Sequence, residues 1–131
     1  MPRFMLDADT VSYALRGEGR VAAQLLEHRP SDLCLSSMSL AELQFGAEAK
    51  RSRKLHRAIQ TFIKGIEVVP FDRAASERFA LVAAALARKG KPIGTFDTLV
   101  AAHALSLGLT VVTNNTKHFS RAPGLTAESW V

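Results

Sequence analysis

The chain has 131 residues, 47% of them hydrophobic and 22% charged, so it suits one domain over residues 1–131 and leaves little room for a second. Its single cysteine, Cys34, excludes an internal disulfide framework and any multi-cysteine metal site. A formal net charge of +5 favours polyanionic partners such as RNA, DNA or an acidic protein.

No segment of the sequence has the pattern of an export or membrane signal. Residues 1–6 are too few for the apolar part of a secretory leader. No apolar stretch approaches the roughly 18 residues that a membrane-spanning helix needs. With the lone cysteine, this predicts a cytoplasmic protein without membrane contact.

Strands and helices alternate in the first half of the chain. In chain order we expect a strand at 4–6, a helix at 20–28, a strand at 33–35, and helices at 39–50 and 52–64. The first strand ends at Asp7, and the Asp9-Thr10 pair after it is typical of a turn. In the helix at 20–28, we expect Val21, Leu25 and Leu26 to share the buried face.

The same alternation continues in the second half. We expect a strand at 66–69, a helix at 74–89, a helix at 96–107 capped by Thr95, and a strand at 109–112. Residues 123–131 fit no element, although Trp130 could anchor them. This alternation predicts an α/β sandwich with a central, mostly parallel sheet.

Acidic and amide side chains fall where strands are expected to give way to helices. These residues are Asp7 and Asp9 after the first strand, Glu42 after the second, Asp97 in the first turn of the helix at 96–107, and Asn115 after the last strand. Open parallel sheets bind ligands beyond the carboxyl ends of their strands. We therefore expect these side chains to converge.

Several carboxylates that share a small volume are costly to ionise without a cation. Hard oxygen ligands of this kind suit Mg²⁺ or Mn²⁺. Such an ion can lower the pKa of a bound water and stabilise charge on an attacked phosphate. An acidic pocket in a basic domain therefore indicates a metal-dependent nuclease.

Each candidate residue also has a purely structural interpretation. Ser39 and Glu42 fit a capping box, in which Glu42 would bond back to the backbone of Ser39. Asp97 could merely complement a helix dipole, and Asn114-Asn115 could be a plain turn.

Three further features are interpreted as structural. His103 lies in line with apolar residues and is expected to be a hydrogen-bonded core histidine. Cys34 is expected to pack in the core. The basic run at 50–54 is interpreted as a solvated helix face, with contact to RNA or a protein partner as the alternative.

Four segments resemble, in order, the motif set of VapC toxins, which are PIN-domain ribonucleases of type II toxin–antitoxin systems. They are FMLD at 4–7, SSMSLAELQFG at 36–46, PIGTFDTLVAAH at 92–103 and VTNNTKHF at 112–119. The resemblance covers nearly the whole chain and implies a PIN-like α/β/α sandwich.

The resemblance also implies roles for individual residues. Asp7, Glu42 and Asp97 fall on the family's acidic, catalytic metal-site positions, and Asn115 falls where many PIN domains have a fourth acid. Thr113 and Ser39 are expected to support the metal ligands. Asp9 departs from the family's usual Asp-Thr-Asn run, so it either supports the ligands or is an added ligand.

The implied activity is hydrolysis of an RNA phosphodiester by a metal-activated water, with Mg²⁺ or Mn²⁺ as cofactor. Similar proteins cut structured RNA, often tRNA and in some cases the anticodon loop of initiator tRNA. They form homodimers and are silenced by a VapB-type antitoxin, commonly through an Arg that reaches the acids. Operator DNA would be bound only through the antitoxin.

Two alternatives stay open at this point. The Asp7-Ala8-Asp9-Thr10 run also fits the start of a haloacid-dehalogenase-like phosphatase, in which Asp7 would be the nucleophile. That class is expected to carry paired acids near its last strand, where this chain has none. The other alternative is a catalytically inactive PIN-like module that binds RNA or protein.

Overall fold

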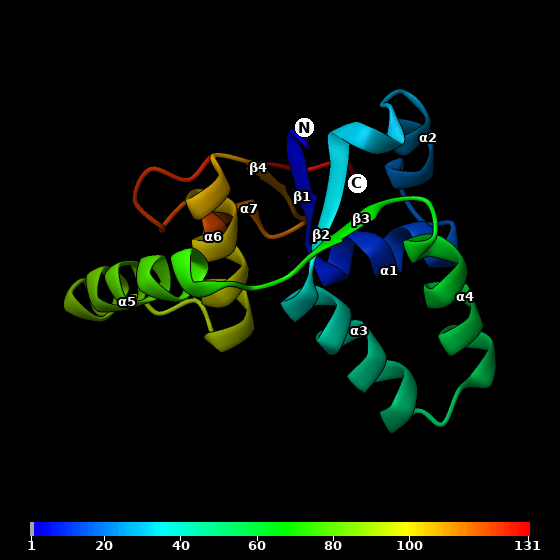
Figure 1. Cartoon of the computed structure of the whole chain (residues 1–131), viewed down its shortest axis with the longest axis horizontal. Helices are drawn as coiled ribbons and strands as arrows, with labels where there is room; N and C mark the ends of the chain where they lie inside the picture. The colour runs from blue at the N-terminus through cyan, green and yellow to red at the C-terminus, as the bar shows by residue number, and fades with distance from the viewer. Residues whose placement is uncertain (1) are drawn as a thin grey trace.

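The short apolar runs of the sequence form strands that are buried on both faces, so helices must cover each side of the sheet. The computed structural model describes residues 2–131 and shows this arrangement (Figure 1). Met1, the first residue of the short N-terminal run, lies outside the described residues. Among residues 2–131, no helix has both the length and the apolar character needed to cross a bilayer.

The strands are β1 (Phe4–Leu6), β2 (Leu33–Ser36), β3 (Glu67–Val69), β4 (Thr110–Val112) and β5 (Ala127–Glu128). They form one sheet in the order β3-β2-β1-β4-β5, and every neighbouring pair is parallel. The predicted α/β fold with a central parallel sheet is therefore confirmed. The extent of a single domain over 1–131 stays a prediction.

The helices are α1 (Ala8–Arg16), α2 (Val21–Leu26), α3 (Ser37–Ala49), α4 (Arg53–Ile63), α5 (Arg73–Arg88), α6 (Thr95–Leu107) and α7 (Thr116–Phe119), and a 3-10 turn, η1, spans Pro30–Asp32. Alternate strand residues face opposite layers. Leu6 and Leu35 pack toward α1 to α4, whereas Met5 and Cys34 pack toward α5 to α7. Cys34 therefore lies in the core, as predicted.

The largest error in the sequence prediction is α1, which occupies the segment expected to turn at Asp9-Thr10. Asp7 caps this helix by accepting a hydrogen bond from the Thr10 amide at 2.8 Å. Val11 is fully buried, and Gly17 ends the helix with a φ of 67°. The Asp cap and the terminal glycine are the sequence signals of this helix, and they outweigh the turn tendency of Asp9-Thr10.

Smaller differences concern helix ends and the C-terminus. The helix expected at 20–28 shrinks to α2, where Leu26 is 88% exposed rather than on the buried face. Thr95 is the first residue of α6, and Gly94 precedes it in the capping position. Trp130 anchors the C-terminal segment as expected, stacking on His28 with ring centroids 4.7 Å apart.

Candidate active site

The sheet topology creates a binding edge at the carboxyl ends of three adjacent strands. The chain runs from β1 to β2 on one side and later returns to β4 on the other, so the connections diverge at β1. Leu6, the last residue of β1, is in register with Leu35 and Val112. The residues that follow these strand ends therefore lie close together, at the switch point where such sheets bind ligands.

Asp7 lies at the centre of this edge. Its backbone amide continues the sheet by donating to the Val112 carbonyl at 3.0 Å, and its side chain caps α1. The carboxyl group is buried, and this desolvation raises its pKa to about 6. Hydrogen bonds from the Thr113 side chain and from Thr10 oppose that rise. Thr113 is itself fully buried, and its predicted support of the metal ligands stays a prediction.

Glu42 reaches the same edge from α3, and the capping-box interpretation of this residue is wrong. Helix α3 begins at Ser37, and its cap is Ser36, whose hydroxyl accepts from the Met38 amide at 3.1 Å. Ser39 lies inside the helix, buried, with no hydrogen-bond partner for its hydroxyl. Glu42 therefore does not cap α3, and Ser39 does not line the pocket.

Asp97 comes from the other helical layer. It is the third residue of α6, which follows α5, so it lies after a helix-to-helix connection, as the predicted helices at 74–89 and 96–107 imply, and not at a strand end like the other acids. Helix α6 leads directly into β4, so its C-terminus lies near the start of that strand. Its N-terminus therefore lies at the opposite edge of the sheet, where the strands end. Burial raises the pKa of Asp97, while its electrostatic interaction with His118 lowers it.

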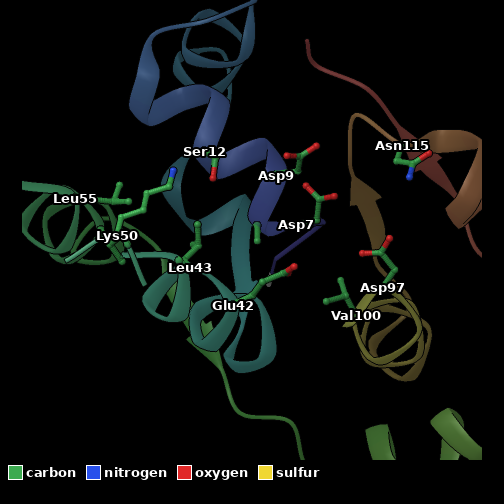
Figure 2. A pocket seen from close by; sticks show the side chains of 13 residues that line it. Asp7, Asp9, Ser12, Glu42, Leu43, Lys50, Leu55, Asp97, Val100 and Asn115 are labelled. Atoms are coloured by element: carbon green, nitrogen blue, oxygen red, sulfur yellow. The ribbon is translucent and has the colours of Figure 1, made fainter. Parts of the chain in front are cut away.

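Asp7, Asp9, Glu42, Asp97 and Asn115 all line one pocket of about 290 Å³. Figure 2 shows these side chains entering it from three sides, with Asp7 and Asp9 on α1 and its cap, Glu42 below them, and Asp97 with Asn115 opposite. The expected convergence of acids from distant segments is thus present in the structure.

The acids influence one another across this pocket. Burial is the main reason why the pKa of Glu42 is raised, and the negative charges of Asp97, Asp7 and Asp9 raise it further. Asp9 is exposed, yet its charge also acts on Asp7 and Asp97. The pocket therefore favours a bound cation when its carboxylates are ionised.

The donor set fits a hard divalent cation, because it consists of carboxylate oxygens and one amide. Within residues 2–131, no three His, Cys, Asp or Glu side chains are arranged to hold an ion by themselves. Mg²⁺ commonly keeps several waters and uses only one or two carboxylates, which is compatible with acids that surround a pocket of this size.

Asn115 is held by two neighbours in its loop. The backbone N–H of Asn115 donates to the Thr113 hydroxyl at 2.9 Å, and the side-chain Nδ2 lies 2.8 Å from Nδ1 of His118. The plain-turn interpretation therefore describes the backbone but misses the position of the side chain at the pocket. His118 was not expected from the sequence, where its position three residues beyond the asparagine pair gave no signal.

His103 has the structural role predicted for it. It is 1% exposed, and its Nδ1 lies 2.8 Å from the Ser36 hydroxyl. Burial lowers its pKa. By contrast, sequence reasoning missed that Lys50 and Ser12 line the acidic pocket. Their spacing from the acids along α3 and α1 was the available signal.

Comparison with known proteins gives matches over almost the entire chain. Residues 4–125 match the PIN domain family. The tRNA(fMet)-specific endonuclease VapC of Shigella flexneri is 37% identical over 131 residues, which cover 99% of each chain. Ribonuclease VapC2 of Haemophilus influenzae is 32% identical over 132 residues, which cover 100% of each chain.

Solved structures give the same result. The chain is similar to DNA-bound VapBC from Salmonella typhimurium, with a TM-score of 0.90, 37% identity and full coverage of both chains. It is also similar to VapBC2 from Rickettsia felis bound to a promoter DNA fragment, with a TM-score of 0.88, 30% identity and 98% coverage of both.

Proposed function

The chain belongs to the PIN-domain family, among its VapC ribonucleases, and from this we propose that it is a divalent-metal-dependent endoribonuclease and the toxin of a VapBC pair. The observation that carries the proposal is the convergence of Asp7, Glu42 and Asp97 on one pocket at the carboxyl edge of the sheet. The family match also removes support from the phosphatase alternative.

We assign the ion, Mg²⁺ or Mn²⁺, to the pocket lined by Asp7, Glu42 and Asp97, whose carboxylates would hold it directly or through bound water, with Asn115 contributing through its carbonyl or through water. When bound, the ion lowers the pKa of a water and stabilises charge on the attacked phosphate. Asp7 is held in place by the Thr10 amide, so little reorganisation is needed when a cation arrives. Asp9 adds negative potential to the pocket from its exposed position on α1.

The substrate that we propose is tRNA, and initiator tRNA in particular, because a relative that is 37% identical is a tRNA(fMet)-specific endonuclease. We further propose a VapB-type antitoxin as partner, homodimer formation and a cytoplasmic location. The related solved structures are VapBC complexes bound to DNA. In our proposal, operator DNA reaches this chain only through its antitoxin.

The test is RNA cleavage by the purified chain, freed of any antitoxin. We expect cleavage of tRNA in Mg²⁺ or Mn²⁺, complete arrest by EDTA, and recovery when the ion is restored. Mapping of the new RNA 5′ ends then identifies the tRNA and the bond that is cut. Cleavage that persists in EDTA would refute the metal mechanism, and no cleavage in either metal would favour an inactive binding module.

A further inference from the structure

One face of α3 lines the pocket for most of the length of the helix. Glu42, Gly46 and Lys50 recur at four-residue intervals, and all three line the pocket. Eight residues of helix correspond to about 12 Å between the first and last of these Cα atoms. The pocket is therefore a trough along α3 that begins at the acids and ends at Lys50.

Lys50 is the basic member of a pocket lining that otherwise carries acidic, neutral polar and apolar residues. In Figure 2 its side chain extends along the pocket toward Ser12, at the end away from Asp97 and Asn115. Within residues 2–131, Lys50 forms no ion pair. Its ammonium group is thus available to an anionic ligand.

Gly46 keeps the middle of this trough open. A glycine inside a helix costs about 1 kcal/mol relative to alanine. The backbone does not require it, because its φ is not in the left-handed region, and an added Cβ would meet no atom within 4 Å. The contribution of Gly46 is therefore the space that it leaves between Glu42 and Lys50.

We propose that Lys50 binds a phosphate of the RNA strand other than the one that is cleaved, in the trough that Gly46 keeps open. The inference rests on the proposed RNA cleavage and names a positioning residue for it. The acids require a cation before they accept the scissile phosphate, whereas an unpaired ammonium attracts a phosphate directly. Leu43 and Leu55 line the pocket beside Lys50 and provide an apolar floor for the sugar or base in between.

The test is the salt dependence of RNA binding by the Asp7→Asn protein in Mg²⁺, which keeps the probe intact. The probe is a labelled single-stranded oligoribonucleotide, and affinity is measured by fluorescence anisotropy. Adding Lys50→Gln should reduce the slope of log K against log salt by about 0.7, and at 0.1 M salt it should weaken binding about fivefold. The matched control is Lys89→Gln, which removes the same charge from an exposed position at the end of α5.

A second pair of variants tests the trough. Gly46→Leu should weaken binding at least as much as Lys50→Gln without lowering the melting temperature, since leucine favours the helix. Gly46→Ala should bind RNA nearly as well as the parent. In the otherwise wild-type enzyme, Lys50→Gln should raise KM and leave kcat largely unchanged.

The proposal is overturned if Lys50→Gln leaves the slope unchanged, if Lys89→Gln changes it equally, or if Gly46→Leu binds normally. These results differ from a failure of the proposed function. In that case the wild-type chain itself would not cleave RNA in Mg²⁺, whatever the behaviour of Lys50.

Discussion

The junctions β1–α1 and β2–α3 place an acid at the same edge of the sheet in two different ways. At the first junction the cap and the acid are one residue, because the Asp7 carboxylate accepts from the Thr10 amide and also lines the pocket. At the second the tasks are separate: Ser36 caps α3, and Glu42 lines the pocket six residues later. Asp7 therefore couples fold stability to the site, whereas Glu42 does not.

The largest effect should come from two substitutions of Asp7. Asp7→Asn and Asp7→Ala should both lower RNA cleavage by about a thousandfold, since each removes a charge proposed to hold the ion. Only Asp7→Ala should also lose the cap, which places its unfolding free energy about 1 kcal/mol below that of Asp7→Asn. Cleavage rates and urea unfolding measure the two effects, and equal stabilities of the two variants would contradict the dual role.

Glu42→Gln should separate activity from stability at the second junction. We expect roughly a hundredfold loss of cleavage with an unfolding free energy within about 0.5 kcal/mol of the wild type. Ser36→Ala is the reciprocal variant, because it removes the cap and leaves Nδ1 of the buried His103 unpaired. It should cost about 2 kcal/mol. If the unfolding free energy of Glu42→Gln were as low as that of Ser36→Ala, Glu42 would contribute to the stability of the fold, contrary to this prediction.

The last effect concerns pH. Burial raises the pKa of Asp7 from 3.8 to about 6, so the folded state favours the neutral carboxyl. The stability that this provides is complete below pH 4 and is lost as pH rises through 6, by about 3 kcal/mol. In EDTA, Asp7→Asn should therefore gain about 2 kcal/mol relative to the wild type between pH 4 and pH 7. Urea unfolding across that range measures it, and a pH-independent difference would contradict the buried-charge account.

Most of the fold could be read from local patterns. The buried strands β1 and β2 are continuous apolar runs, and α4 and α5 carry clear helical periodicity, whereas the two-residue strand β5 lies in a segment that fitted no predicted element. Helix α1 was missed because a residue that can cap a helix can also begin a turn, and only the packing of Val11 decides between them.

The sequence predicted which residues form the site, but it did not predict what each neighbouring residue does there. Strand ends identified Asp7 and Glu42 because parallel strands end at one edge, and the start of a helix identified Asp97. The sequence did not reveal that Ser36 caps α3 in place of Ser39, since both serines offer the same hydroxyl. The position of Lys50 at the pocket was also hidden, because a cation on a helix surface is usually solvated.

The three acids come from opposite sides of the strand layer, Asp7 and Glu42 with α1 and α3, and Asp97 with α6. The distance from Asp97 to Asp7 and Glu42 therefore depends on how closely α6 approaches the sheet. Three alanines of α6, Ala101, Ala102 and Ala104, are fully buried in the core cluster that also contains Met5 and Val111 of the sheet. A single added methyl group there would shift Asp97 without touching the pocket. In the proposed enzyme, affinity for the cation would therefore depend partly on the packing of small side chains that do not contact the ion.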